Sequence, residues 1–160
     1  MVIKKYIADS NIFYMGIPFQ SASDTKYYIT QDIFDEINHI KKKIDGLDFL
    51  LSTEKVIIID PTINYIEHIY KKIKSHGQFG LSKPDCSIIA LGMQLKIPIM
   101  STDYTLINMA KLLLLDTFIP GKSTFEIVKT KKFCSICKKY FGIRHMYCNL
   151  CGNKLIFKKI

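Results

Sequence analysis

Short apolar runs alternate along the first 120 residues with longer segments in which apolar residues recur every three or four positions. The periodic segments predict helices at about Thr30–Ile44, Pro61–Ser75, Pro84–Leu95 and Thr105–Leu113. The runs predict strands at Ile3–Ala8, Val56–Ile59, Pro98–Ser101 and Leu115–Ile119. Apolar strands that alternate with amphipathic helices are typical of a parallel sheet covered on both faces. We therefore expect an α/β fold with three layers.

Two segments lack either pattern. Gly16–Tyr28 shows little regular signal, and we expect it to form a loop near the functional site. Pro120-Gly121 ends the α/β unit and opens a linker, because this pair favours a turn. The sequence therefore divides into a domain at residues 1–120, a linker at 121–132 and a small C-terminal domain at 133–160.

The charge of the chain is concentrated near its C-terminal end. Residues 1–128 contain 14 Lys or Arg and 14 Asp or Glu, whereas residues 129–160 contain nine basic residues and no acidic one. The whole formal charge of +9 therefore lies in the last 32 residues. A localised basic segment favours a polyanionic partner, and a solvated basic tail is the alternative.

The apolar segments are too short to predict a membrane protein. The longest unbroken apolar runs span only a few residues, as at Leu112–Leu115, and a membrane-spanning helix needs far more. The N-terminus turns polar after Ala8 without a long apolar core or a cleavage site, so it does not resemble a signal peptide. We expect a cytoplasmic protein with no membrane partner.

Four of the five cysteines form two CxxC pairs in the basic segment. Ten residues separate Cys134 and Cys137 from Cys148 and Cys151. Each pair lets a tight turn direct two thiolates at one Zn²⁺, and two pairs complete a tetrahedral shell of sulfur. We expect one structural zinc per chain, with no position open to a substrate. Disulfides are the alternative, which the lack of secretory features disfavours.

Cations and aromatic residues alternate between the two CxxC pairs. This mixture can neutralise phosphates and stack on unpaired bases, so it predicts binding of single-stranded RNA. Packing of the small domain is the alternative role for the aromatic side chains. The residues concerned are Lys138, Lys139, Tyr140, Phe141, Arg144, His145 and Tyr147.

Acidic residues follow two of the predicted strands. Asp9 comes directly after the first strand, and Asp103 follows the strand Pro98–Ser101. The carboxyl ends of parallel strands meet at one edge of the sheet, where such folds bind ligands, so we expect these acids to lie close together. The neighbouring residues that can hydrogen-bond the acids or a bound phosphate are Ser10, Asn11, Ser101 and Thr102.

Two further acids lie on predicted helices. Isoleucines form a buried stripe along the first of these helices, and Glu36 borders that stripe whereas Asp35 lies on the opposite face. Asp85 lies in the first turn of the helix Pro84–Leu95, where a carboxylate can also be a simple capping group. Both roles of Asp85 remain open.

Together, Asp9, Glu36, Asp85 and Asp103 would form a carboxylate cluster that requires cations. Oxygen ligands of this kind favour Mg²⁺ or Mn²⁺. Such ions orient and deprotonate a water for in-line attack on a phosphodiester and stabilise the leaving oxygen. We expect these four acids to bind the metal and to carry catalysis.

The order of these motifs resembles the PIN-domain nuclease family over residues 1–119. The matching segments are Asp9-Ser10-Asn11, Glu36-Ile37, Leu81-Ser82 followed by Asp85, and Ser101-Thr102-Asp103-Tyr104. With the four cysteines behind it, the chain looks like the archaeal form of the NOB (Nin-one-binding) endoribonucleases. Many relatives carry two adjacent acids where this chain has Thr102-Asp103, so a fifth acidic contributor is missing.

The resemblance implies a PIN-like fold followed by a zinc ribbon that contacts RNA. It also implies Mn²⁺ or Mg²⁺ in the PIN site and cleavage at the 3′ end of immature small-subunit ribosomal RNA. The expected partners are this precursor RNA and the immature small ribosomal subunit.

Two other functions are open. A toxin-type PIN ribonuclease of the VapC kind would cut tRNA or mRNA, but such chains normally end near residue 120 and lack a zinc ribbon. A noncatalytic RNA-binding scaffold would use the ribbon alone, and the presence of all four acids argues against it. Metal-dependent cleavage of naked RNA separates an enzyme from a scaffold, and the identity of the substrate separates the two nucleases.

Overall fold

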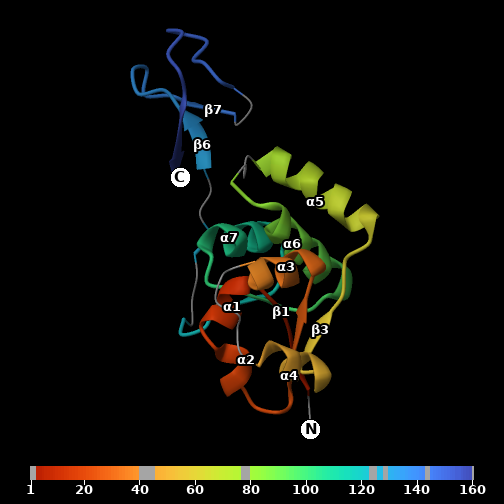
Figure 1. Cartoon of the computed structure of the whole chain (residues 1–160). Coiled ribbons are helices and arrows are strands. Elements are labelled where there is room, and N and C mark those ends of the chain that lie inside the picture. The colour runs from red at the N-terminus through yellow and green to blue at the C-terminus, as the bar shows by residue number, and fades with distance from the viewer. Residues whose placement is uncertain are drawn as a thin grey trace.

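A computed structural model describes residues 3–39, 46–76, 80–122, 126–127, 130–142 and 145–159. The strands form two sheets, a five-stranded sheet from the first three-quarters of the chain and a three-stranded sheet within residues 130–159 (Figure 1). No helix within the described ranges is both long and apolar enough to cross a bilayer.

The larger sheet is parallel, and its strands lie in the order β3-β2-β1-β4-β5. The chain first adds β2 and β3 on one side of β1, and then returns to add β4 and β5 on the other side. The strand order therefore reverses between β1 and β4. Open parallel sheets bind ligands at such a reversal, outside the carboxyl ends of the strands. The strands are β1 (Lys4–Ala8), β2 (Thr25–Ile29), β3 (Val56–Ile58), β4 (Ile99–Met100) and β5 (Thr117–Phe118).

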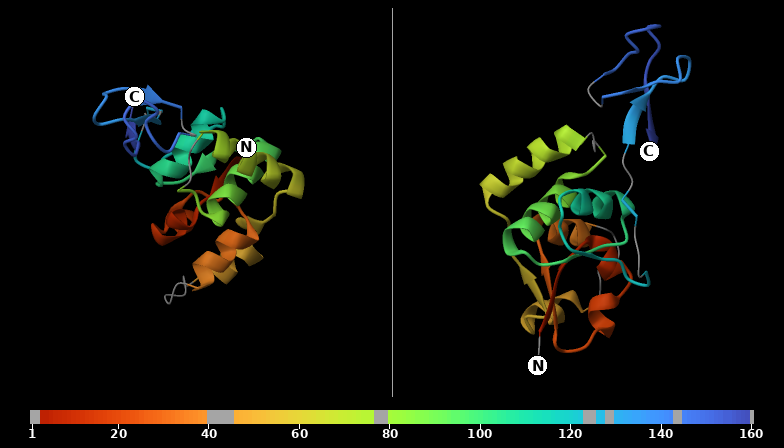
Figure 2. Two further views of the ribbon diagram at one scale, coloured as in Figure 1. Left: turned by 90° about the horizontal axis from the view of Figure 1, so that it is seen from above. Right: turned by 180° about the vertical axis from the view of Figure 1, so that it is seen from behind.

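Helices cover both faces of this sheet (Figure 2). Helices α1 to α4 lie in the connections from β1 to β2 and from β2 to β3, which move toward one side of the sheet. Helices α5 to α7 lie in the connections from β3 to β4 and from β4 to β5, which move toward the other side. Right-handed crossovers therefore place these two groups of helices on opposite faces of the sheet. The three-layer α/β fold that the sequence predicts is confirmed. The helices are α1 (Ser10–Tyr14), α2 (Ile17–Gln20), α3 (Gln31–His39), α4 (Leu47–Ser52), α5 (Ile63–His76), α6 (Lys83–Leu95) and α7 (Tyr104–Leu112).

The core lies between the sheet and these helices. Ile7 of β1, Ile99 of β4, Ile88 of α6 and Ile107 of α7 are fully buried. Ile33 on α3 is buried as the predicted stripe requires, and the end of that predicted helix beyond His39 lies outside the described residues. The most deeply buried side chains therefore pack around β1 and β4, the two strands between which the strand order reverses.

The prediction of a loop at Gly16–Tyr28 is wrong. This segment contains α2 and most of β2, which pairs with β1 on one side and β3 on the other. In β2, buried Thr25, Tyr27 and Ile29 alternate with half-buried Lys26 and Tyr28. A search for continuous apolar runs misses such a strand, because a lysine and two tyrosine hydroxyls interrupt it.

The smaller sheet is antiparallel and has the order β7-β6-β8. Its strands are β6 (Thr130–Phe133), β7 (Tyr140–Phe141) and β8 (Ile156–Lys159). β6 begins at Thr130, inside the segment predicted as a linker. The four cysteines of the CxxC pairs lie between β6 and β8, so the strands form the frame of the cysteine-containing domain.

Gly92 allows α6 to pack directly on β4, which suggests a test of the core. A Cβ atom at this position would lie 2.9 Å from Cδ1 and Cγ1 of the fully buried Ile99. We predict that Gly92→Ala lowers the free energy of unfolding by about 1–2 kcal/mol, because overpacking outweighs the better helix propensity of alanine. Urea unfolding measures the change, and Gly80→Ala is the control because no atom lies within 4 Å of its added Cβ. A Gly92→Ala protein as stable as the wild type would contradict this packing.

Candidate active site and metal centre

Asp9 is the centre of the candidate active site at the carboxyl edge of the larger sheet. Its backbone N–H donates to the carbonyl of Met100 at the end of β4, 3.1 Å away, and the residue is only 4% exposed. Ser101 Oγ donates to Oδ2 of Asp9 at 2.7 Å, and Asn11 Nδ2 donates to the same oxygen at 3.2 Å. Ser10 Oγ lies 3.4 Å from Oδ1. Three of the four predicted supporting side chains therefore contact this one carboxylate.

Ser10 also connects Asp9 to Glu36. Its Oγ donates to Oε1 of Glu36 at 2.9 Å, which joins the start of α1 to α3. Glu36 is half-buried, whereas Asp35 is exposed and accepts a hydrogen bond from Gln31 Nε2 on its own helix. Glu36 is thus the acid of α3 that is joined to Asp9, through the hydroxyl of Ser10.

Asp85 forms a capping box at the start of α6. Its Oδ2 accepts hydrogen bonds from the backbone N–H and from Oγ of Ser82, both at 2.7 Å. In return, the Asp85 backbone N–H donates to Ser82 Oγ at 3.2 Å. The capping role that the sequence left open is therefore present, and the contacts that form it use a single carboxylate oxygen.

Asp103 caps α7 and is linked to Asp9 through Ser101. Its Oδ1 accepts hydrogen bonds from the backbone N–H groups of Thr105 and Leu106, at 2.6 and 3.4 Å. Its own N–H donates to Ser101 Oγ at 2.9 Å, the same oxygen that donates to Asp9. Ser101 is fully buried, and Thr102 lies half-buried between it and Asp103. One hydroxyl thus holds two of the acidic residues in register.

Negative charge accumulates at this edge of the sheet. Burial raises the pKa of the Asp9 carboxyl above its usual value, the hydrogen bond from Ser101 opposes this, and the charges of Asp85 and Glu36 raise the pKa further. Burial raises the pKa of Tyr14 on α1 as well, with further contributions from Glu36 and Asp9. The structure therefore brings Asp9, Glu36 and Asp85 into electrostatic contact. A bound cation would relieve their repulsion.

The sequence pattern did not single out Lys122, which brings a cation close to this edge. A turn over residues 119–122 is closed by a hydrogen bond from Lys122 N to the Ile119 carbonyl at 3.1 Å. Gly121 has a φ of +76°, as the third residue of a type II turn requires. The turn carries Lys122 to Tyr104, whose hydroxyl accepts a hydrogen bond from Nζ. The Pro120-Gly121 pair predicts the turn but not the contact between Lys122 and Tyr104. Because Tyr104 directly follows Asp103, this contact brings the lysine close to the acidic edge.

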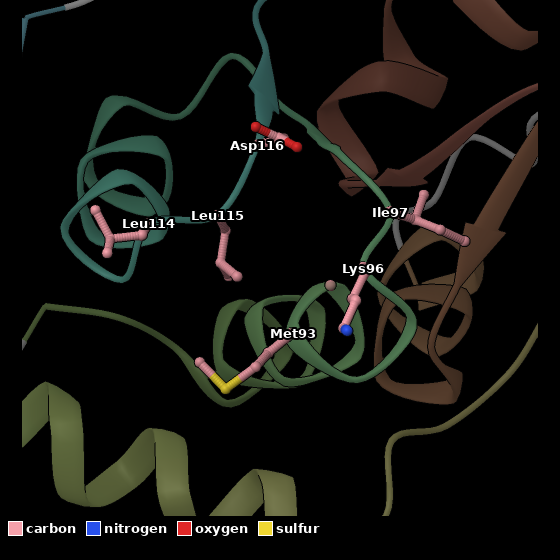
Figure 3. A pocket seen from close by; sticks show the side chains of 7 residues that line it. Met93, Lys96, Ile97, Leu114, Leu115 and Asp116 are labelled. Carbon is pink, nitrogen blue, oxygen red and sulfur yellow. The ribbon is translucent and has the colours of Figure 1, made fainter.

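A pocket of about 130 Å³ lies at the other end of the same sheet (Figure 3). Its lining includes Ile97, which precedes β4, and Asp116, which precedes β5. The pocket therefore lies next to the amino ends of β4 and β5 and the C-terminal end of α6, whereas the acids Asp9 and Asp103 follow the carboxyl ends of strands. The pocket is not part of the acidic site.

The second candidate centre consists of the four CxxC cysteines, whose sulfur atoms all lie within 4.8 Å of one another. Among the described residues, no other set of three or more potential ligands lies so close together. The Sγ atoms of Cys134 and Cys151 are 3.5 Å apart, and those of Cys137 and Cys148 are 3.8 Å apart. Tetrahedral Zn–S bonds of about 2.3 Å require separations of this size. All four thiols are free, which favours a metal site over disulfides.

The two CxxC turns have the same backbone geometry. The carbonyl of Cys134 accepts from Lys138 N at 2.9 Å, and that of Cys148 accepts from Gly152 N at 2.8 Å. Lys138 has a φ of +54° and Gly152 a φ of +72°. Lys138 therefore occupies a left-handed position that the second turn gives to glycine.

The pKa values of two of the thiols shift in opposite directions. The backbone N–H of Cys137 donates to Cys134 Sγ at 3.3 Å and is the main cause that lowers the pKa of Cys134 to about 6. The contact with Cys151 is the main cause that raises the pKa of Cys137 to about 12. Four thiolates therefore require a cation between them, and Zn²⁺ fits this donor set.

The residues predicted to bind RNA occupy different surroundings. Lys138, Lys139 and Tyr140 are exposed, as is Tyr147. Phe141 is half-buried against the cysteine cluster, and the ring of the exposed His145 lies 6.1 Å from its ring. Arg144 lies outside the described residues. Phe141 therefore contributes to packing, whereas the exposed cations and rings are available to a ligand.

Comparison with known proteins identifies the family of the larger domain. A sequence profile described as "PIN domain of ribonuclease" matches residues 6–95, which are 90 of the 160 residues. The chain belongs to the PIN-domain ribonuclease family. The PIN domain therefore supplies the sheet edge that carries the acids, and the protein is a nuclease.

Two archaeal proteins are similar over most of the chain. Endoribonuclease Nob1 of Pyrococcus abyssi is 27% identical over 143 residues, which cover 88% of this chain and 84% of that protein. Endoribonuclease Nob1 of Methanocaldococcus jannaschii is 28% identical over 142 residues, which cover 84% and 68%. Both similarities extend beyond the PIN domain.

A solved structure is similar to the PIN domain in fold. A chain from the crystal structure of VapBC2 from Rickettsia felis, bound to a DNA fragment from its promoter, matches with a TM-score of 0.54. The match covers 72% of this chain and 98% of that chain at 17% identity. At this identity the likeness shows the fold alone.

The acidic site of the PIN domain fits a hard divalent cation. Its donors are carboxylate oxygens, and the most buried of them, on Asp9, has two acidic neighbours. Mg²⁺ keeps several waters and takes only one or two direct carboxylate ligands. The acids can therefore contribute through water as well as directly.

The cysteine geometry predicts one zinc per chain. Cys148→Ser should lose the zinc and unfold the small sheet, because the sulfur cluster forms most of its interior. Cys86→Ser is the control, since Cys86 is buried on α6 in the PIN domain and should leave the zinc content unchanged. Elemental analysis of freshly purified protein measures both. A wild-type protein without zinc would refute the assignment.

Proposed function

We propose that this protein is a metal-dependent endoribonuclease that matures the 3′ end of small-subunit ribosomal RNA in the cytoplasm. The observation that carries the proposal is that one chain combines the acidic edge of a PIN domain with a four-cysteine domain that holds the net positive charge. The similarity to two Nob1 endoribonucleases over most of the chain supports it. The substrate is the precursor of this RNA within the immature small ribosomal subunit.

Asp9, Glu36, Asp85 and Asp103 are the proposed ligands of Mg²⁺ or Mn²⁺. When bound, such an ion activates a water and stabilises the charge that develops on the phosphate oxygens. Ser101 and Asn11 hold Oδ2 of Asp9, and this leaves Oδ1 in contact only with Ser10 among the described hydrogen bonds. The hydrogen bonds from these side chains orient the carboxylate before any substrate arrives.

The helix caps at Asp85 and Asp103 are compatible with metal binding. Asp85 uses Oδ2 in its capping box, and Asp103 uses Oδ1 at the start of α7. A carboxylate has two oxygens, so each residue retains one for an ion or its water shell. Each cap also fixes the rotamer of its side chain, which reduces the entropy lost on binding an ion.

The cysteine domain is proposed to be a zinc ribbon that binds single-stranded RNA. Lys131 and Lys158 lie directly opposite each other on β6 and β8. Nζ of Lys158 lies 4.1 Å from the ring centroid of Phe133 and 5.9 Å from that of Tyr140. Like charges directly opposite repel, and an RNA phosphate would relieve this while the exposed ring of Tyr140 stacks on a base.

The toxin-type nuclease has weaker support. The likeness to VapBC2 concerns the fold, and the zinc ribbon separates this chain from nucleases that consist of a PIN domain alone. The noncatalytic scaffold has weaker support because Ser10, Asn11 and Ser101 hold the buried Asp9 in a defined orientation.

The cleavage site tests the proposed function. We expect the protein with Mn²⁺ to cut an RNA that spans the 3′ end of small-subunit ribosomal RNA at one position, and Asp9→Asn to abolish the cut. Asn is similar in size and can keep the hydrogen bond from Ser101, so the fold and the affinity for RNA should change little. Mapping of the cleaved ends measures the activity.

Asp35→Asn is the matched control for Asp9→Asn. Asp35 is exposed on the same helix as Glu36, and its carboxylate contacts Gln31 of that helix. Full activity of Asp9→Asn would remove Asp9 from the site, and metal-dependent cutting of tRNA with no cut in the ribosomal RNA would favour the toxin-type function.

The ribbon should hold the RNA through its lysines. We predict that the double variant Lys131→Ala and Lys158→Ala weakens RNA binding and flattens the plot of log affinity against log salt, by about 0.7 per lost phosphate contact. Lys71→Ala with Lys74→Ala on α5 is the control of equal charge, since both lysines are exposed on the PIN domain. A titration at several salt concentrations measures the slopes. Equal slopes for the two double variants would mean that the β6–β8 surface does not hold the RNA.

A further inference from the structure

Two buried hydroxyl groups join the helices that carry Glu36 and Asp85. Thr30 directly precedes α3, and Ser87 lies in the first turns of α6. Their Oγ1 and Oγ atoms are 2.7 Å apart although 57 positions separate the residues in the sequence. Thr30 is 0% exposed and Ser87 3% exposed. This contact is therefore a polar link inside the core, between the two segments that carry Glu36 and Asp85.

The hydrogen bonds of these two groups have a defined direction. Ser87 Oγ lies 2.7 Å from the Pro84 carbonyl, which can only accept, so the single hydroxyl hydrogen of Ser87 goes there. Thr30 must then donate to Ser87, and Thr30 Oγ1 accepts from the backbone N–H of Ile33 at 3.4 Å. The bonds therefore run without interruption from the first turn of α3 to the first turn of α6. We call this series the hydroxyl chain; it consists of the Ile33 N–H, the Thr30 hydroxyl, the Ser87 hydroxyl and the Pro84 carbonyl.

Other contacts at the same junction constrain the helices less. Nζ of Lys83 lies 2.8 Å from Oδ1 of Asp32, which also links α6 to α3. Lys83 is largely exposed, and exposed ion pairs contribute little to a fixed geometry. Asp60 Oδ1 accepts from the backbone N–H of Gln31 at 2.8 Å, and this bond holds α3 but not α6. Among the described hydrogen bonds between these two segments, the hydroxyl chain is the one that is buried.

We propose that Thr30 and Ser87 are positioning residues that set the separation between Glu36 and Asp85. Ser87 is two residues after Asp85, and Thr30 directly precedes the helix that carries Glu36. Asp9 is held separately by β1, β4 and Ser101. The relative position of the three acids thus depends on how α3 and α6 are spaced. The inference rests on the proposed function of these acids as metal ligands.

The chemistry of the link explains why hydroxyls serve better here than apolar groups. Two apolar side chains would fill the same space but could slide past each other, because dispersion contacts have little directional preference. A buried hydrogen bond has a preferred length and angle, and breaking it leaves a buried polar group without a partner. The link therefore opposes small shifts between the helices.

Mn²⁺ affinity of the full chain tests the proposal, with the paramagnetic resonance signal of free Mn²⁺ as the readout. Ser87→Ala and Thr30→Val should each weaken Mn²⁺ binding by about tenfold, the low end of the effect of removing a direct partner of a metal ligand, because both residues act through the helices that carry the acids. Thr30→Ser keeps the hydroxyl and should bind Mn²⁺ like the wild type. The zinc content should stay unchanged in all three variants.

A further control tests whether any destabilising substitution in α6 weakens Mn²⁺ binding. Ile89→Val removes one methylene from a fully buried residue of the same helix and leaves the hydroxyl chain intact. Equal weakening of Mn²⁺ binding in Ile89→Val and Ser87→Ala would overturn the proposal. The double variant Thr30→Val with Ser87→Ala removes both partners, so it should fold better than the sum of the single losses suggests. If it folds and binds Mn²⁺ like the wild type, the positioning role is also refuted.

Asp9→Asn separates this inference from the proposed function. If Asp9→Asn binds Mn²⁺ as the wild type does, the acidic site itself is refuted and the positioning role with it. If Asp9→Asn loses Mn²⁺ while Ser87→Ala and Thr30→Val retain it, the acidic site stands and only the positioning role is overturned. Loss in all three, with retention in Thr30→Ser and Ile89→Val, is the expected result.

Discussion

The burial of one carboxylate governs the arrangement of this protein. Asp9 lies at the end of β1 where the strand order reverses, almost wholly out of contact with water. A carboxylate in such a place is costly unless hydrogen bonds and opposite charge compensate it. Ser101 and Asn11 provide the hydrogen bonds, and the hydroxyl of Ser10, which donates to Glu36, lies within 3.4 Å of the carboxylate. In the proposed enzyme a metal ion would supply the opposite charge, so the packing of the fold and its chemistry meet at a single residue.

The features that could be predicted from the sequence are those with a local signature. Apolar runs predict β1, β3, β4 and β5, and periodic segments predict α3, α5, α6 and α7. The acids after β1 and β4 mark the edge of the sheet, and the CxxC spacing identifies the sulfur cluster. The second role of Asp85, as a helix cap, was also visible as an alternative, because its distance from Ser82 matches a capping box.

The features that escaped prediction depend on contacts between distant segments. β2 is a central strand without a continuous apolar run, and only its neighbours β1 and β3 explain why Tyr27 is buried. The contact between Thr30 and Ser87 joins segments 57 positions apart, and neither residue stands out locally. Lys158 contacts the ring of Phe133 because β8 pairs with β6, and these two strands lie on opposite sides of the four cysteines in the sequence. Spacing along the chain does not encode such pairings.

The charge balance of the two domains has a kinetic consequence. The PIN domain brings a neutral sum of charges and an acidic edge, whereas the ribbon brings the excess of lysines. In the proposed enzyme, ionic strength acts mainly on capture of the RNA, and the supply of divalent ions acts mainly on turnover of RNA already captured. The two conditions then act mainly on different steps. The ribbon can therefore stay occupied by RNA while the PIN site has no metal bound and does not cut.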